Sequence, residues 1–143
     1  MSPAQQSLID AAKATAIAYN NKDWTAARNA MTPDFVYDEV ATHRKVQGPD
    51  DVLAVWKGWA TAMPDSKCEF HAAHASGNTV ALELTWRGTH TGPMQTPAGE
   101  IPATGKSFEL RAVQVVELAG DKTKSMRQYF DMATLFQQLG ISS

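Results

Sequence analysis

The sequence holds one cysteine, no marked excess of charge and no long apolar run, and each of these features excludes a class of protein. Cys68 alone can form no internal disulfide and gives no metal-ligand spacing. Lysine and arginine number 13 against 15 acidic residues and are scattered, so we expect no nucleic-acid partner. No apolar run approaches the length of a membrane span, so we expect no membrane association.

The composition is that of a soluble globular domain. Hydrophobic residues make up 43% of the chain and charged residues 20%, and 143 residues are enough to bury a core. The N-terminal segment MSPAQQSLIDAAKATAIAYNNKD lacks the basic leader and the apolar block of a signal peptide, so we expect a cytoplasmic protein. No repeat or interior linker is visible, and the chain is therefore interpreted as one domain over residues 1–143.

Helix signals occur at four places in the chain. Ser2 and Pro3 predict the start of a first helix, and Asp23 can cap a short second helix. Gly48 and Pro49 begin a third, and the segment MATLFQQLG forms a fourth with a C-terminal glycine. The first helix shows one apolar face, which carries Leu8, Ala12, Thr15, Ala16 and Tyr19.

Strand signals fill most of the remaining chain. The second helix is expected to extend to Met31 and to be followed by a turn at TPD, after which FVYDEV is predicted to be a strand. The segments SKCEFHAAHA, TVALELTWRGTH, SFELRAVQVVEL and KSMRQYFD follow the third helix as four consecutive strands. Helices gathered around consecutive, mostly antiparallel strands indicate an α+β domain.

Alternation along the strands predicts a curved sheet with two unlike faces. In the third of these four strands, Phe108, Leu110, Ala112, Gln114 and Val116 share one face, and charged residues mix with valines on the other. We expect the apolar face to wrap around the third helix. The half-apolar outer face suits self-association, so a homodimer through that face is expected.

A long segment over residues 91–105 interrupts this pattern with three prolines and three glycines. Loops of this length in compact domains often serve as lids or binding loops, although an excursion without a function is the alternative. His90 stands at its start, on the same strand face as Trp86, and is expected to point inward. It could transfer a proton or bind a carbonyl oxygen, or it could hold the loop through hydrogen bonds.

The segments YFDMATLFQQLG, RGTHTG and PATGKSFEL together resemble the SnoaL-like polyketide cyclase and ester cyclase group. That group belongs to the NTF2-like superfamily, named after nuclear transport factor 2. The resemblance implies an NTF2-like cone, in which a curved, mostly antiparallel sheet wraps around three N-terminal helices and a short C-terminal helix follows. It also implies a pocket inside the cone. The superfamily includes cyclases, isomerases and proteins that only bind, so the fold alone does not fix the chemistry.

A more distant resemblance, to limonene epoxide hydrolase, rests on TGKS and YFD and implies which residues face the pocket. It places the hydrolase's working aspartate at Gln128, and its arginine and second aspartate at Leu84 and Trp86. Epoxide hydrolysis by that triad is therefore not expected here. The residues expected to bind a ligand are Tyr37, Trp59, Met63, Phe70, His74, Trp86, Leu110, Gln114 and Phe130.

Four residues are candidates for catalysis: Glu39, His90, Gln128 and Asp131. Glu39 could act as a base if burial raised its pKa, or it could be a solvated carboxylate at a strand end. Asp131 follows YF and directly precedes the last helix, so it could be an acid or, preferably, a helix cap. Gln128 occupies the position of an acid but cannot serve as a base.

The leading hypothesis is a SnoaL-like domain that binds a small hydrophobic carbonyl compound without a cofactor or a metal. As an enzyme it would be a cyclase or isomerase that abstracts a proton next to the carbonyl. Glu39 or His90 would be the base, while Tyr37 and Gln114 would donate hydrogen bonds to the enolate. The alternatives are a non-catalytic binding module with the same pocket and a dimerising domain whose interior is filled.

Overall fold

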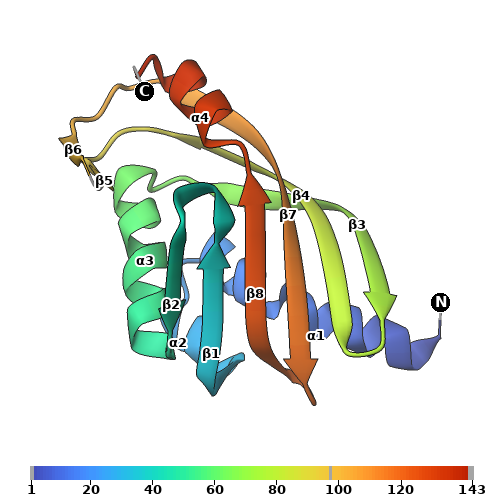
Figure 1. Cartoon of the computed structure of the whole chain (residues 1–143). Coiled ribbons are helices and arrows are strands. Elements are labelled where there is room, and N and C mark those ends of the chain that lie inside the picture. The colour runs from blue at the N-terminus through green and yellow to red at the C-terminus, as the bar shows by residue number, and fades with distance from the viewer. Residues whose placement is uncertain (1, 97, 142–143) are drawn as a thin grey trace.

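The computed structural model describes residues 2–96 and 98–141 (Figure 1). The N-terminal half contains α1 (Pro3–Asn20), α2 (Trp24–Asn29), β1 (Met31–Glu39), a 3-10 turn (Val40–Thr42), β2 (Arg44–Gln47) and α3 (Pro49–Ala62). The C-terminal half contains β3 (Lys67–Ser76), β4 (Thr79–Thr89), β5 (Met94–Thr96), β6 (Gly99–Ile101), β7 (Ser107–Ala119), β8 (Lys122–Phe130) and α4 (Met132–Leu139).

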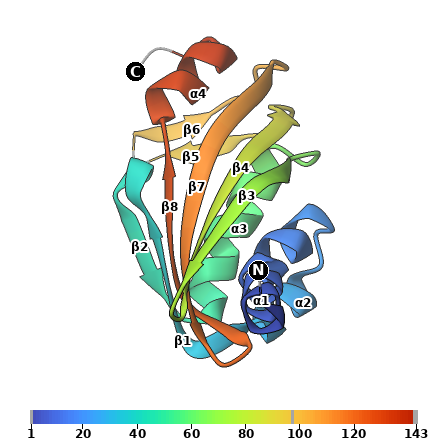
Figure 2. The same ribbon diagram turned by 90° about the vertical axis from the view of Figure 1, so that its right-hand side faces the viewer.

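Six strands form one curved sheet in the order β2-β1-β8-β7-β4-β3. All neighbouring strands are antiparallel except β1 and β8, which are parallel. In Figure 2, α1, α2 and α3 lie on one side of this sheet, and α4 covers one end of it together with the β5–β6 hairpin. The predicted α+β fold, an NTF2-like cone, is confirmed.

The helices begin where the sequence predicts. Ser2 caps α1 in a reciprocal arrangement with Gln5, and Asp23 caps α2 by accepting from the backbone N–H of Ala26. Gly48 precedes α3 with a φ of 90°, a conformation that a residue without a Cβ adopts readily. Gly140 ends α4 in the left-handed conformation.

The concave face of the sheet and the helices enclose two groups of buried side chains. The larger group lies between α1, α3 and the middle of the sheet, and it includes Tyr37, Trp56, Leu82 and Leu84. The smaller group, called here the lid cluster, joins the end of α3, the hairpin, β7 and α4. Its buried members are Ala62, Met63, Met94, Phe108, Leu110, Leu135 and Leu139.

One local prediction was wrong, and two short elements were not predicted. Met31 belongs to β1 and not to α2, because a strand paired with β8 begins directly after α2 ends. The segment Arg44–Gln47 forms β2, which the sequence pattern did not indicate because this strand is short and half exposed. Residues 91–105 contain the antiparallel hairpin β5–β6, in which Met94 pairs with Ile101.

His74 faces the outer side of the sheet, although the resemblance to limonene epoxide hydrolase implied a position in the pocket. A bulge lies between Phe70 and Ala72, and it shifts the register of β3 against β4 by one residue. From that point every side chain of β3 changes face, so His74 contacts Glu83 at 2.8 Å on the outer surface. Ala73 and Ala75 take the inner positions instead.

The outer face carries several ion pairs over β3, β4 and β7. Arg87 bridges Glu69 at 2.8 Å and Glu109 at 3.3 Å, all three side chains being about half exposed or more. The homodimer through this face stays a prediction. Among the described residues, no helix combines the length and apolar character needed to cross a membrane.

Candidate functional site

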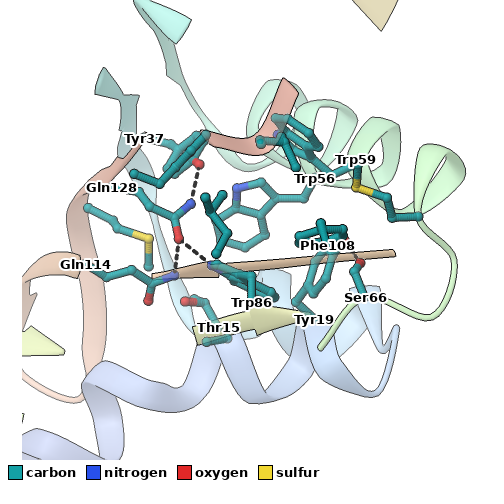
Figure 3. A pocket seen from close by; sticks show the side chains of 16 residues that line it. Thr15, Tyr19, Tyr37, Trp56, Trp59, Ser66, Trp86, Phe108, Gln114 and Gln128 are labelled. Atoms are coloured by element: carbon teal, nitrogen blue, oxygen red, sulfur yellow. Dashed lines mark hydrogen bonds between the residues drawn. The ribbon is translucent and has the colours of Figure 1, made fainter. Parts of the chain in front are cut away.

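A cavity lies inside the cone, between the two groups of buried side chains. The cavity has a volume of about 70 Å³, which is more than one water requires. Side chains from α1, α3, α4 and five strands or loops line it (Figure 3). They are Thr15, Ala16, Tyr19, Tyr37, Trp56, Trp59, Met63, Ser66, Trp86, Phe108, Leu110, Gln114, Met126, Gln128, Phe130 and Leu135.

Glu39 lies behind one side of this cavity, fully buried at the end of β1. Its carboxylate accepts from Tyr37 at 2.8 Å, from Thr42 at 2.7 Å, from Arg44 at 2.8 Å and from the indole N–H of Trp59 at 2.9 Å. The Arg44 guanidinium supplies the compensating charge that a buried carboxylate requires. Glu39 is thus fully engaged, and it is not among the lining residues.

A chain of hydrogen bonds continues from Glu39 along the wall of the cavity. Gln128 donates through its amide nitrogen to the hydroxyl oxygen of Tyr37 at 2.8 Å. The amide oxygen of Gln128 accepts from Trp86 and from Gln114, both at 2.9 Å. Figure 3 shows this chain between Tyr37 and Gln114. The chain from Arg44 and Glu39 through Tyr37 and Gln128 to Gln114 is called here the polar wall.

The chemistry of its members fixes the direction of every bond in the polar wall. An ionised carboxylate only accepts, so the single proton of Tyr37 points to Glu39, and Tyr37 must accept from Gln128. The indole N–H of Trp86 only donates, which independently orients the amide of Gln128. Gln114 therefore directs its nitrogen to Gln128, and its oxygen faces away from that bond.

Two polar atoms at the cavity have no hydrogen-bond partner among the described residues. They are Oε1 of Gln114 and Oγ1 of Thr15, whose residues are 3% and 0% exposed. Both residues line the cavity, Gln114 from β7 and Thr15 from α1 (Figure 3). Buried polar atoms are almost always partnered, so these two oxygens are exceptions to the general rule.

A second polar pair faces the cavity from the opposite side. The hydroxyl groups of Tyr19 and Ser66 are 2.6 Å apart. Burial raises the pKa of Tyr19 to about 12. Burial also raises the pKa of Tyr37, and the negative charge of Glu39 raises it further. Both phenols are therefore neutral at physiological pH and cannot act as phenolate bases.

The lining contains no strong acid or base. Among the described residues, no aspartate, glutamate, histidine, lysine, arginine or cysteine lines the cavity, and no group of three such residues suited to a metal ion occurs. Three tryptophans and two phenylalanines are among the lining residues instead: Trp56, Trp59, Trp86, Phe108 and Phe130. The cavity thus presents aromatic walls with a few oriented hydrogen-bonding groups.

His90 is fully buried but is not among the residues that line the cavity. Its Nδ1 accepts from the backbone N–H of Thr104 at 3.2 Å and lies 3.0 Å from that residue's hydroxyl. The His90 backbone also bonds to Lys106 and Gly105. Burial lowers the pKa of His90, which keeps the ring neutral. This geometry supports the loop-holding interpretation of His90.

Asp131 caps the last helix, as preferred from the sequence. It is exposed, and it accepts from the backbone N–H of Ala133 at 3.0 Å and from the Thr134 hydroxyl at 2.7 Å. The Thr134 hydroxyl bond is the main reason that the pKa of Asp131 is lowered. Asp131 does not line the cavity.

The structure brings together most of the residues that the sequence placed in the pocket. The cavity lining includes Tyr37, Trp59, Met63, Trp86, Leu110, Gln114, Gln128 and Phe130. Phe70 instead packs against the larger buried group beside Lys13, and His74 is on the outer face. Sequence reasoning missed Thr15 as a polar cavity residue, although a threonine within the apolar face of α1 was a usable signal.

Comparisons with known proteins agree with this architecture. The family model of the SnoaL-like polyketide cyclases matches residues 9–139. No curated protein matches the chain. A candidate SnoaL-like polyketide cyclase from Jannaschia sp. CCS1 superposes with a TM-score of 0.86 at 16% identity, covering 100% of this chain and 98% of its own.

Two further solved structures show the same fold. IdmH, a candidate polyketide cyclase from Streptomyces antibioticus, has a TM-score of 0.78 at 22% identity, covering 94% of this chain and 99% of its own. An LEH-like epoxide hydrolase from M. tuberculosis has a TM-score of 0.72 at 20% identity, with coverages of 94% and 90%. The family match spans most of the chain, and this protein therefore belongs to the SnoaL-like polyketide cyclase family.

Proposed function

We propose that this protein binds a small, mostly apolar organic molecule in the cavity of the cone and acts as a binding module. The observation that carries the proposal is the lining: aromatic and aliphatic side chains surround a few oriented polar atoms, and no ionisable base among the described residues faces the cavity. A concave, largely apolar surface with few convergent polar groups is the usual form of a small-molecule site.

The base and the hydrogen-bond donors expected for proton abstraction are engaged with other residues or lie away from the cavity surface. Tyr37 commits its only proton to Glu39, so it is not freely available to an enolate oxygen, and one of the two amide protons of Gln114 is donated to Gln128. Glu39 has four donors and no place in the lining. Of the hypotheses drawn from the sequence, the binding module therefore has the stronger support.

One observation favours a second candidate function, enolisation of a ketone by relay. Tyr37 lines the cavity and donates at 2.8 Å to Glu39. A proton taken from the carbon next to a carbonyl would pass to the oxygen of Tyr37 while the phenol proton passes to Glu39. Returning both protons would complete an isomerisation without a cofactor.

Ligand-induced stabilisation tests the binding module. We expect toluene at ten times its Kd to raise the free energy of unfolding by about 1.4 kcal/mol, seen as a rise of a few degrees in Tm. Ala16→Leu, which extends a side chain into the cavity from α1, should abolish the rise, whereas Ala4→Leu on the exposed face of the same helix should retain it. Equal stabilisation of both variants would place binding elsewhere and refute the proposal.

Hydrogen–deuterium exchange of a ketone tests the relay. If the protein is only a binding module, exchange of the α-protons of cyclohexanone in D₂O, followed by NMR, should match the rate in buffer. Exchange that is accelerated by the wild type, and lost in both Tyr37→Phe and Glu39→Gln, would support the relay instead. Circular dichroism of each variant would verify that the fold is retained.

A further inference from the structure

We infer that α4 is the gate of the cavity, that the side-chain amide of Gln138 holds it closed against β7, and that a ligand enters and leaves when this contact opens. The inference rests on the proposed binding function and adds the route by which a ligand reaches the cavity. Figures 1 and 2 show α4 across one end of the sheet. Leu135 of α4 is 1% exposed and lines the cavity, so α4 itself forms part of the cavity wall.

The exposure of the lining residues places the cavity entrance beside α4. All of them are buried except Trp59, Trp86 and Phe130, which are partly exposed. Trp86 packs edge to face against the buried ring of Tyr19, with 5.2 Å between the ring centroids. Trp59 of α3 and Phe130 of β8 form a second such pair at 6.2 Å, and Phe130 directly precedes Asp131, the cap of α4. This second pair places the entrance between α3 and the beginning of α4.

Gln138 fills a gap at the edge of β7. The pairing of β8 with β7 starts at Ala112, whereas β7 begins at Ser107, so the first residues of β7 have no strand on that side. Oε1 of Gln138 accepts from the backbone N–H of Glu109 at 2.7 Å, and its Nε2 donates to the Glu109 carbonyl oxygen at 2.8 Å. This pair of bonds is called here the latch. Among the described residues, it is the only hydrogen bonding between α4 and another helix or strand.

Fewer directional bonds hold α4 than hold the other walls of the cavity. The strands that line the cavity are joined to their neighbours by continuous ladders of backbone hydrogen bonds. Apart from the latch, α4 is held by apolar contacts of Leu135, Leu139 and Phe136 with the lid cluster. Apolar contacts are non-directional, so they do not fix α4 at one position as hydrogen bonds do. The latch is therefore the contact that sets the closed position of α4.

The β5–β6 hairpin is the other candidate for a moving part at this end, since residues 91–105 were expected to be a lid or a binding loop. None of the described residues of that segment lines the cavity. Backbone hydrogen bonds tie the segment down near both ends: the N–H of Gly92 donates to Ala62 at 3.0 Å, and the N–H of Gly105 donates to His90 at 2.8 Å. The hairpin is therefore a fixed part of the rim, and α4 is the part that opens.

Binding kinetics of two matched variants test the inference. Gln138→Met keeps an unbranched side chain of similar length and removes the latch, while Gln137→Met, at an exposed position of the same helix, is the control. Stopped-flow tryptophan fluorescence would follow association and dissociation of toluene on the full chain, because three tryptophans line the cavity.

We expect Gln138→Met to raise the association and dissociation rate constants of toluene about tenfold each, the size of one to two net hydrogen bonds. The latch does not touch the ligand, so the Kd should stay as it is in the wild type. Gln137→Met should match the wild type in both rate constants. Ile101→Ala trims β6 where it packs against the lid cluster, and it should change neither rate constant as much as Gln138→Met does.

Native-state hydrogen exchange gives a second test, which needs no ligand. We expect the backbone amides of α4 to exchange through a local opening and faster than those of β7. Gln138→Met should lower the protection of the α4 amides about tenfold and leave the protection of β7 unchanged. If the amides of α4 and β7 exchange only together, through global unfolding, α4 does not open locally and the gate is refuted.

The outcomes separate this inference from the binding proposal. Equal rate constants in the wild type and in Gln138→Met refute the latch. A Kd that rises in Gln138→Met at an unchanged association rate constant shows that α4 supports the bound ligand, which refutes the gate. Faster association and dissociation in Ile101→Ala alone would assign the gate to the hairpin and also refute it. If toluene does not bind, the proposed binding function falls, and hydrogen exchange decides whether α4 opens.

Discussion

The polar wall and the lid cluster meet at the same cavity, but directional hydrogen bonds hold the first and side-chain packing holds the second. In the polar wall, Glu39 fixes Tyr37, Tyr37 helps to fix Gln128, and Gln128 fixes Gln114. In the lid cluster, the buried contacts of Met94, Leu135 and Leu139 are apolar and set no orientation. The comparison indicates that the polar wall gives the cavity its polar groups. The lid cluster gives the cavity its shape and covers one end of it.

This difference has a physical consequence for tolerance to substitution. A hydrogen-bond chain fails when one member is removed, because each neighbour then loses the group that orients it. A packed cluster accepts apolar exchanges of similar volume. Substitutions in the wall should therefore alter ligand preference, while substitutions in the lid should alter stability and access.

The largest effect is expected at Glu39. Glu39→Leu removes the acceptor shared by Tyr37, Thr42 and Trp59. Each buried donor left without a partner costs about 1–3 kcal/mol. We therefore expect the free energy of unfolding to fall by about 3 kcal/mol or more. Urea denaturation would measure the loss. Glu69→Leu, at an exposed ion pair on the outer face, is the matched control and should cost less than about 1 kcal/mol. Equal losses at the two positions would contradict the assigned role of Glu39.

A somewhat smaller effect is expected where the segment after β4 passes α3. A Cβ added to Gly92 would lie 2.0 Å from the carbonyl oxygen of Thr61, so Gly92→Ala must displace this segment at a cost of about 2 kcal/mol. The comparison variant Gly58→Ala, in the exposed interior of α3 with nothing within 4 Å, should instead gain about 0.5–1 kcal/mol. Thermal denaturation of both variants would measure this contrast. A Gly92→Ala protein as stable as the wild type would show that the approach to α3 is not needed.

The stability of the protein should respond to a substitution at Thr15 in the opposite direction from one at Glu39, because the Thr15 hydroxyl has no partner among the described residues. Thr15→Val removes a buried hydroxyl without a partner and should raise the free energy of unfolding by about 1 kcal/mol in ligand-free protein. Urea denaturation measures the gain, and Thr25→Val, at an exposed position in α2, is the control. A loss of stability in Thr15→Val would mean that the hydroxyl has a stabilising partner.

The smallest effect is a pH dependence centred on His90. Its folded-state pKa is lowered by burial from 6.5, so the unfolded chain binds the proton more readily. Stability contributed by the neutral ring is therefore complete above pH 6.5 and is lost as the pH falls below that value. His90→Asn, whose side-chain oxygen can still accept from Thr104, should flatten this part of the curve of unfolding free energy against pH. If the free energy of unfolding falls equally steeply below pH 6.5 in the wild type and in His90→Asn, the buried ring of His90 does not cause the pH dependence.

The sequence was sufficient for the elements whose signals are local. Ser2, Asp23, Gly48 and Gly140 marked helix ends correctly, since capping depends on residues within one turn. Alternation in β7 correctly gave the buried face from Phe108 to Val116, because one face of that strand is continuously covered. These features positioned most of the cavity lining in advance.

Alternation failed where a strand departs from regular pairing. The bulge after Phe70 turned His74 outward, and no residue pattern in SKCEFHAAHA announces an extra residue. The strands β2 and β5 have four and three residues, too few to show a period. Short strands of this kind exist because a partner strand supplies their hydrogen bonds, and sequence alone does not show the partner.

The sequence by itself determined the α+β architecture, the helix ends and the apolar inner face, because these follow from contacts within a few residues and from the two-residue period of a strand. Only the tertiary structure decided which of the inward-facing polar side chains hydrogen-bond to one another. Tyr37 and Gln128 are separated by 91 positions, and in their hydrogen bond the amide of Gln128 donates to the hydroxyl of Tyr37, whose own proton goes to Glu39. The same set of long-range bonds orients the amide of Gln114, and no local pattern contains that information.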